Sequence, residues 1–287
     1  MTQRFGLSAA LLTPYDAVGA VDAPRLAQHA DALLRAGADG VTPLGTTGEG
    51  ASIGLNERRG VLAALGARGI ELGRITWGVA ASSAEEALTQ VAQGVEAGVT
   101  RFLLPPPFYF SAPSEAGLFD WHADLFAAAP PKARFVLYHI PQVTGAPLPP
   151  RLAGRLLSAF PERVAAIKDS SGDWGNAEAL MAIDGLPVVI GDERLLHRAA
   201  AQGAAGAISG MANLHPARLA RVLGDAREDA GLSAQTDAVV AHPVVPALKA
   251  LMAARSGDAA WDRVRPPLMP LADDARAALL ATAREAA

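Results

Sequence analysis

Short apolar runs rich in β-branched residues alternate with longer amphipathic segments along most of the chain. The runs predict strands at residues 7–12, 40–44, 75–80, 102–104, 135–139, 165–168, 188–191 and 207–209. The amphipathic segments predict helices at residues 24–36, 56–66, 83–97, 114–128, 149–159, 176–183, 192–201 and 216–223. Successive units begin roughly 27 residues apart, a common length for one strand–helix unit of a parallel sheet.

Eight such units in about 220 residues predict an α/β fold, a closed (β/α)8 TIM barrel. The alternative is an open doubly wound sheet, which would carry a glycine-rich dinucleotide loop after its first strand. Residues 11–15 read Leu-Leu-Thr-Pro-Tyr instead, which favours the barrel. Residues 225–287 have helical periodicity and no strand pattern. We therefore expect a barrel over residues 1–224 and a C-terminal helical domain over residues 225–287, packed on the barrel or on a neighbouring subunit.

Composition excludes several classes of protein. The 287 residues are 51% hydrophobic and 19% charged, which excludes a disordered chain. The net charge of −4 offers no basic surface for nucleic acid or an anionic membrane. The absence of cysteine excludes a disulfide scaffold, a thiol nucleophile and a thiolate zinc site. With no apolar leader or spanning segment in the sequence, we expect a cytoplasmic protein.

One lysine, Lys168, lies at a position where active sites of barrel enzymes form. Only Lys132, Lys168 and Lys249 occur among 25 basic residues, the rest being arginine. Lys168 ends the sixth predicted strand, and barrel active sites form at the carboxyl ends of strands. Burial penalises the ammonium form of a lysine and so favours a free amine that can attack a carbonyl. The structural alternative is a lysine that pairs with Asp169 or extends to the rim. Lys132 and Lys249 are expected to be ordinary surface or interface residues.

A polar turn follows the second predicted strand, with the sequence Gly45-Thr46-Thr47-Gly48-Glu49. Its hydroxyls and backbone amides suit a small anion, and two threonines suit a carboxylate better than a polyphosphate. We expect Thr46, Thr47 and Gly48 to bind substrate. The alternative is a tight turn whose threonines cap the next helix.

The three tyrosines, Tyr15, Tyr109 and Tyr138, each lie at or just after the end of a predicted strand and so belong to one face of the barrel. Tyr138 ends the strand before Lys168, and a phenol hydrogen-bonded to a threonine can relay protons. Tyr15 is the weakest of the three and is expected to be a loop residue. Beside Tyr138, His139 is expected either to contact substrate or to bond a neighbouring backbone group. The six histidines lack metal-ligand spacing, so we expect no metal site.

Three motifs in this order, at these separations, resemble the dihydrodipicolinate synthase / N-acetylneuraminate lyase family. They are Gly45 to Glu49, Tyr138-x-x-Pro141-x-x-Thr144-Gly145, and Ile167-Lys168-Asp169. The resemblance runs over nearly the whole chain, including residues 105–109, which read Pro-Pro-Pro-Phe-Tyr, and the helical C-terminal part. It implies a barrel with a C-terminal helical domain that assembles as a homo-oligomer, usually a tetramer or otherwise a dimer.

The resemblance also implies a mechanism and its residues. Lys168 would form a Schiff base with pyruvate or another 2-oxo acid, so no external cofactor is needed. Thr46 and Thr47 would hold the carboxylate, Tyr138 would relay protons, and the backbone around Ile208 would form part of the pocket wall. Tyr109 matches a tyrosine that members of the family lend across a dimer interface.

The substrate is less constrained, because the chain departs from the synthase pattern. The synthases carry an arginine in a Ser-Arg-Thr-Gly context for a second carboxylate, whereas this chain has Gln142-Val143-Thr144-Gly145. An aspartate directly after the lysine, here Asp169, is similar to the pattern in aldolases and dehydratases of 2-keto-3-deoxy sugar acids. We therefore expect a lyase or aldolase acting on such an acid or on pyruvate. The alternatives are dihydrodipicolinate synthase, a 2-keto-3-deoxy acid dehydratase, a metal-dependent aldolase and a catalytically silent 2-oxo-acid sensor.

Overall fold

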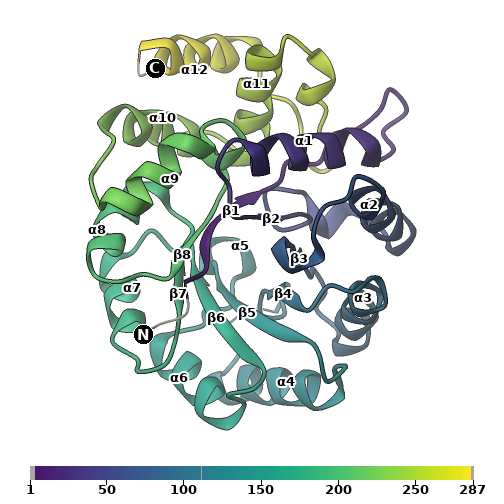
Figure 1. Ribbon diagram of the computed structural model, residues 1–287, viewed down its shortest axis with the longest axis vertical. Helices are drawn as coiled ribbons and strands as arrows, with labels where there is room; N and C mark the ends of the chain where they lie inside the picture. Colours follow the sequence, from purple (N-terminus) through teal and green to yellow (C-terminus); the bar gives the residue numbers. More distant parts are fainter. Residues whose placement is uncertain (1–3, 111, 286–287) are drawn as a thin grey trace.

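Eight parallel strands form the centre of the molecule, with helices around them (Figure 1). The computed structural model describes residues 4–110 and 112–285. The strands are β1 (Gly6–Ala10), β2 (Gly40–Thr42), β3 (Thr76–Gly78), β4 (Arg101–Leu104), β5 (Arg134–His139), β6 (Val164–Asp169), β7 (Val188–Ile190) and β8 (Gly206–Ser209). All eight predicted strands are confirmed, with ends that differ from the prediction by at most two residues.

The sheet closes between β2 and β3. Hydrogen-bonded neighbours follow the order β2-β1-β8-β7-β6-β5-β4-β3. The two outer strands of that order meet through a parallel bridge between Val41 and Ile75. The Gly78 N–H donates to the Pro43 carbonyl across the same junction at 3.0 Å. The predicted TIM barrel is therefore confirmed.

The helices around the barrel begin and end largely where the sequence predicts. Asp22 accepts from the Arg25 N–H at the start of the first helix, and Ser83 accepts from the Glu86 N–H at the start of the third. A short helix after β5 was not predicted. The helices are α1 (Ala23–Arg35), α2 (Leu55–Ala67), α3 (Ala84–Ala97), α4 (Glu115–Ala128), α5 (Pro141–Thr144), α6 (Pro150–Ala159), α7 (Trp174–Met181), α8 (Leu196–Ala201) and α9 (Pro216–Asp225).

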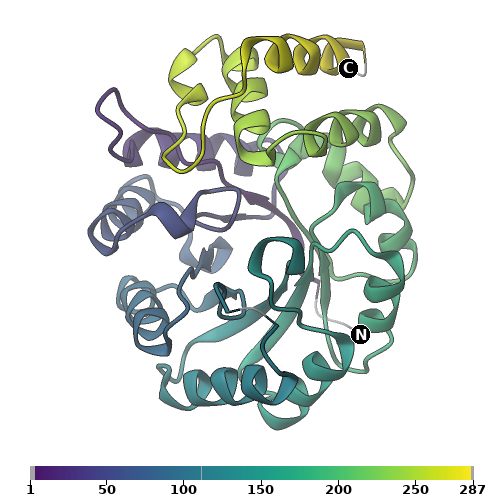
Figure 2. The same cartoon turned by 180° about the vertical axis from the view of Figure 1, so that it is seen from behind.

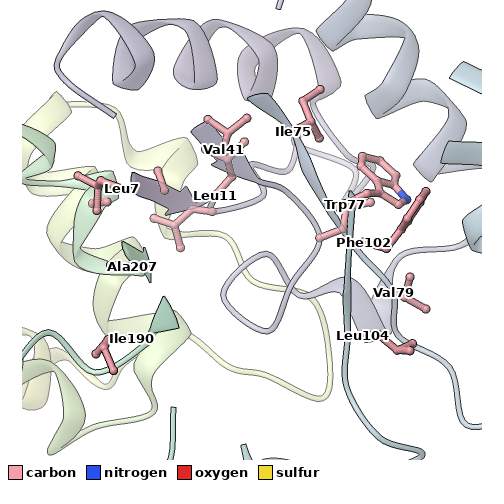
Figure 3. Close-up of a cluster of buried hydrophobic side chains, with 14 of the residues drawn as sticks. Leu7, Leu11, Val41, Ile75, Trp77, Val79, Phe102, Leu104, Ile190 and Ala207 are labelled. Atoms are coloured by element: carbon pink, nitrogen blue, oxygen red, sulfur yellow. The ribbon is translucent and has the colours of Figure 1, made fainter. Parts of the chain in front are cut away.

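The core has two layers, because alternate residues of a strand face opposite sides of the sheet. The outer layer packs against the helices, and Figure 3 shows part of it, with Trp77 of β3 close to Phe102 of β4. A Cβ at Gly94 of α3 would lie 2.6 Å from Phe102 Cε1, so this glycine lets the helix approach the sheet. The barrel interior is filled by Ala10, Leu103, Val136, Tyr138, Ile140, Ala166, Val189 and Ile208.

The chain continues beyond the barrel in α10 (Ala230–Val240), α11 (Val244–Ser256) and α12 (Asp273–Glu285). These helices lie together beside α1, at the top of both views (Figures 1 and 2). Trp261 packs against His29 of α1, with ring centroids 4.8 Å apart. The predicted C-terminal helical extension is confirmed, while its boundary at residue 225 stays a prediction. Within the described ranges, the helices lack the length and hydropathy needed to cross a bilayer.

Candidate active site

Lys168 lies at the carboxyl end of β6 and points into the barrel. Ala166, two residues earlier, belongs to the interior cluster, so the alternation of the strand turns Lys168 to the same side. Tyr138 of β5 is the register partner of Lys168 in the neighbouring parallel strand. The two side chains therefore project side by side at the mouth of the barrel. Lys168 is 5% exposed and Tyr138 is 3% exposed.

A chain of hydrogen bonds joins three of the predicted residues. Lys168 Nζ donates to the Tyr138 hydroxyl at 3.2 Å and lies 4.3 Å from the centroid of the tyrosine ring. Thr46 Oγ1 donates to the same hydroxyl at 3.4 Å. The loop after β2 and the carboxyl ends of β5 and β6 thus bring a hydroxyl, a phenol and a nucleophile together, although 92 residues separate Thr46 from Tyr138.

These contacts change the acidity of the phenol. Burial by itself would raise the pKa of Tyr138, but the positive charge of Lys168 and the bonds with Thr46 and Lys168 outweigh it. The pKa of Tyr138 is therefore lowered from its ordinary value of 10.0. A phenol in this state can both give up and regain a proton near the lysine, as a proton relay requires.

The three side chains open into a cavity of about 350 Å³ at the mouth of the barrel. Thr47 and Ile208, two further predicted residues, line it as well. An apolar cavity of about 540 Å³ adjoins it and shares Thr46, Tyr138 and Val143 with it. Further residues lining the first cavity include Ser170, Asp192, Glu193, Arg194, Val244 and Leu248.

The segment after β1 holds the threonine turn, residues 45–49, in place through a hydrogen bond and close packing. Thr13 Oγ1 donates to the Gly48 carbonyl at 2.6 Å. A Cβ at Gly48 would lie 2.8 Å from the Leu11 carbonyl oxygen, so the turn packs too closely against the segment after β1 for any other residue. The amides of Glu49 and Gly50 donate within the turn, to the carbonyls of Thr46 and Gly45. Thr46 and Thr47 are the residues of this motif that line the cavity, and the amides of Glu49 and Gly50 are already bonded within the turn.

Gly191, directly after β7, gives Lys168 its room. A Cβ at this position would lie 2.8 Å from Lys168 Cε and 1.9 Å from Ser170 Oγ. Any larger residue would displace the lysine or the serine. The prediction of a strand ending at Gly191 did not identify this role, because the close approach comes from β6 and not from the neighbouring sequence.

Two residues predicted to contact substrate, His139 and Gly48, are not among the described residues that line the cavity. His139 is buried and its ring lies outside the cavity, where Nδ1 accepts from the Leu148 N–H at 2.9 Å. Burial lowers the pKa of His139, which suits a neutral ring acting as an acceptor. The backbone-bonded alternative therefore holds for His139. Gly48 packs against the backbone of Leu11 and Leu44 instead of lining the cavity.

Tyr109 lies away from the cavity of its own chain. It is 90% exposed and has a φ of +85°, and its ring meets Phe110 edge to face with centroids 5.9 Å apart. The positive φ is unusual for a residue with a side chain. Together, Tyr109 and Phe110 present two aromatic side chains to the surroundings of the molecule.

The prediction for Lys249 is wrong. This lysine is 0% exposed and pairs with Glu49, the last residue of the threonine turn motif. Tyr15, expected as a loop residue, does lie in a loop but is buried, and Lys249 Nζ lies 4.3 Å from the centroid of its ring. The sequence suggested neither contact, because 200 residues separate Glu49 from Lys249. Among the described residues, histidine and carboxylate side chains form no cluster suited to a metal ion.

The barrel, together with the lysine, tyrosine and threonine joined at its mouth, defines the class of the protein as a (β/α)8-barrel lyase. More particularly, residues 3–286 match the Dihydrodipicolinate synthetase family, and the chain belongs to that family.

Relatives of the chain agree in length and fold. An uncharacterized DapA-like lyase of Chloroflexus aurantiacus is 39% identical over 98% of this chain and 96% of its own length. A 4-hydroxy-tetrahydrodipicolinate synthase of Pelobacter propionicus is 31% identical over 96% of each chain. The crystal structure of dihydrodipicolinate synthase from Agrobacterium tumefaciens superposes with a TM-score of 0.95 at 39% identity, covering 98% of this chain and 99% of the other.

Proposed function

We propose that the protein is a Schiff-base lyase in which Lys168 condenses with pyruvate or a longer 2-oxo acid. The observation that carries the proposal is the contact of Lys168 Nζ with the Tyr138 hydroxyl, 3.2 Å long, beside a cavity that Thr46 and Thr47 also line. A 2-oxo acid presents a carboxylate and a ketone on adjacent carbons. The threonine hydroxyls would bind the carboxylate and so direct the ketone carbon toward the amine.

The cleavage would depend on the positive charge of the imine nitrogen that Lys168 contributes. Lys168 would pass one ammonium proton to Tyr138, and the resulting amine would add to the ketone carbon. A second proton moves from the nitrogen to the ketone oxygen and Tyr138 returns the first, so the oxygen leaves as water and the imine keeps one proton and the positive charge. When the bond between the third and fourth carbons of a longer acid breaks, its electrons enter an enamine instead of an unstabilised carbanion. Tyr138 would take the proton from the departing hydroxyl as the aldehyde leaves. Protonation of the enamine and hydrolysis of the imine release pyruvate and restore the amine.

The residues that line the cavity support a hydroxylated substrate chain. Asp192 and Glu193 line it, and both carboxylates already accept hydrogen bonds, Asp192 from Arg194 and Glu193 Oε1 from Ser209 and Met211. A carboxylate has about four acceptor positions, so each could also accept from a substrate hydroxyl. Arg194 lies there too, but its guanidinium is bonded to Asp192 and Asp237 at 2.6 to 2.9 Å. Val143 occupies the position at which the synthases carry an arginine. These features support a 2-keto-3-deoxy sugar acid more than an acceptor with its own carboxylate.

Synthesis of 4-hydroxy-tetrahydrodipicolinate from pyruvate and aspartate semialdehyde is the second candidate. It is favoured by the names of relatives such as the Pelobacter protein. Dehydration of a 2-keto-3-deoxy acid would use the same imine. A panel of 2-keto-3-deoxy sugar acids, N-acetylneuraminate, and pyruvate with aspartate semialdehyde, assayed on one preparation, separates these reactions. Turnover of any of them excludes a silent 2-oxo-acid sensor, and full activity with a chelator excludes a metal-dependent aldolase.

We further propose a homo-oligomer, a tetramer or a dimer, in which Tyr109 of one chain completes the site of its neighbour. The exposure of Tyr109 and Phe110, and the apolar cavity beside Thr46, support this arrangement. Residues 225–287 would then act as a helical domain that walls one side of the site.

Borohydride trapping tests the chemistry directly. Reduction in the presence of pyruvate should convert the imine to a stable amine, with one pyruvate-derived group per chain on the peptide containing Lys168. The variants Lys168→Ala and Lys168→Arg should lose this labelling completely, because neither side chain offers an unprotonated primary amine. Continued labelling of either variant at a single site would place the chemistry on another residue.

A further inference from the structure

The threonine turn ends in a buried ion pair that the proposed chemistry does not use. Glu49 follows Thr47 by two residues, and Lys249 approaches it from α11. Both side chains are almost wholly buried, with 1% and 0% of their surface exposed. A buried pair of charges adds little to stability compared with apolar residues of similar volume. Stability alone therefore does not explain why this ion pair lies beside the candidate site.

Every polar atom of the pair is used to join distant segments. Lys249 Nζ donates to Glu49 Oε1 and, at 2.6 Å, to the carbonyl of Arg263. Its third neighbour is the ring of Tyr15, which follows β1. An arginine could not replace this lysine without repacking, since a guanidinium is planar and larger than the ammonium group that these three partners enclose.

The second oxygen of Glu49 extends the same connection. Oε2 accepts from the backbone N–H of Arg265 at 2.9 Å. The guanidinium of Arg265 in turn donates to both oxygens of Glu57 in α2 at 2.8 Å, and to the carbonyls of Gly19 and Ser52 at 2.7 Å. The segment after α11 is thus tied to the loops after β1 and β2.

The pair lies directly behind the walls of the cavity. Leu248, next to Lys249 in the sequence, lines the cavity, and so does Val244 one turn earlier in α11. A Cβ at Gly210 would lie 3.0 Å from Leu248 Cδ1 and 3.6 Å from Thr47 Oγ1, so the segment after β8 lies against both α11 and the threonine turn. Glu49 itself has a φ of +55°, a conformation that needs support from its surroundings.

We propose that Glu49 and Lys249 are positioning residues: their ion pair holds the Thr46–Thr47 turn against α11 and so sets where the substrate carboxylate binds. The inference rests on the proposed function, because it assigns the turn the role of carboxylate anchor. Charge gives the pair a preferred distance and direction that two apolar side chains would lack. Within the described residues, the hydrogen bonds that join Lys168, Tyr138 and Thr46 include neither residue of the pair.

The double variant Glu49→Gln/Lys249→Met tests the proposal, because it removes both charges at nearly constant volume. Borohydride trapping is measured against pyruvate concentration, which needs no knowledge of the second substrate. We expect the half-saturating pyruvate concentration to rise roughly tenfold, as small misplacements of binding groups do. The maximal labelling per chain and the melting temperature should stay near the wild-type values, which separates positioning from stability. Glu49→Asp, which keeps the charge but shortens the side chain, should raise the half-saturating concentration as well.

A matched control removes an ion pair of the same helical region that lies away from the turn. Arg218 and Asp229 join α9 to α10 at 2.6 Å, and the variant Arg218→Met/Asp229→Asn should leave the pyruvate dependence unchanged. A wild-type half-saturating concentration in the folded Glu49→Gln/Lys249→Met protein, or in Glu49→Asp, overturns the positioning role and leaves the Schiff-base function standing. Absence of trapping in the wild-type protein overturns the function instead.

Discussion

The hydroxyl of Tyr138 accepts hydrogen bonds from Lys168 and from Thr46, so its own proton is available for a partner in the cavity. The same two donors stabilise the phenolate and lower the pKa of Tyr138. A relay must release and recover its proton within one turnover. The geometry therefore supports the proposed role of this tyrosine in proton transfer.

Tyr138→Phe removes the hydroxyl and keeps the ring over Lys168. Slow imine formation with pyruvate should remain, whereas turnover of the cleavable substrate should fall by roughly 10²- to 10⁴-fold, the usual contribution of a positioned acid–base group. Single-turnover trapping and steady-state rates on the same preparation measure the two effects. Near-normal turnover in this variant would remove Tyr138 from the mechanism.

At the scale of elements, α4 carries a titratable group in the outer layer of the core. His122 is completely buried, its Nδ1 lies 2.7 Å from the Leu118 carbonyl, and its ring packs edge to face with Phe126. Burial lowers the pKa of His122 from 6.5 to about 4, although the bond to Leu118 opposes the shift. The neutral ring is therefore the form that the folded helix accepts.

This shift makes the stability of the fold depend on pH. Between pH 6.5 and about 4, His122 is protonated in the unfolded chain and neutral in the folded chain. The contribution of His122 to the free energy of unfolding is therefore complete above pH 6.5 and is lost as the pH falls toward 4. The loss amounts to about 3 kcal/mol below pH 4. Urea unfolding measures the free energy of unfolding of the wild type and of His122→Gln at pH 8 and at pH 4.5. Between these two pH values, that free energy should fall by about 2 kcal/mol less in the variant than in the wild type. Equal drops in both proteins would contradict the assignment.

The strands and helices were predictable because their signals are local. Alternation of apolar residues and the caps at Asp22 and Ser83 lie within a few residues of the elements they define. Local signals were not sufficient for the helix predicted at residues 192–201. This segment begins as a 3₁₀ turn, Glu193–Leu195, before α8. There the Glu193 side chain bonds Ser209 and the Met211 N–H of the next unit, contacts that no local pattern encodes.

At the scale of the whole molecule, the barrel presents two exposed aromatic residues, Tyr109 and Phe110, after β4. Large exposed aromatic side chains are typical of contact surfaces between subunits. The apolar cavity beside Thr46 is lined by Phe108, the residue before Tyr109, and by Pro243 and Leu268 of the C-terminal segment.

Assembly is tested by sedimentation and by activity together. The wild-type protein should sediment as a dimer or tetramer at micromolar concentration, and Tyr109→Ser/Phe110→Ser should weaken that assembly at least tenfold, since aromatic anchors dominate interfaces. Tyr109→Phe should keep the assembly and lower turnover, because only the hydroxyl is removed. A wild-type monomer with full activity would contradict both the assembly and the shared tyrosine.

Much of the candidate site followed from the sequence, because parallel strands place their carboxyl ends at one mouth. Lys168, Tyr138, Thr46, Thr47 and Ile208 needed only correct strand ends and the family resemblance to be grouped in one cavity. What each side chain touches could not be derived in this way. His139 turns to the Leu148 amide and Gly191 makes room for Lys168 because of how neighbouring strands pack.

The sequence by itself determined the barrel, the order of its elements and the residues at its mouth, since those depend on short-range periodicity and on a rule for parallel strands. Only the tertiary structure decided that Lys249 is buried and paired with Glu49. Closing the barrel and laying α11 across it bring these residues together from 200 positions apart, and burial then makes their mutual charge compensation obligatory.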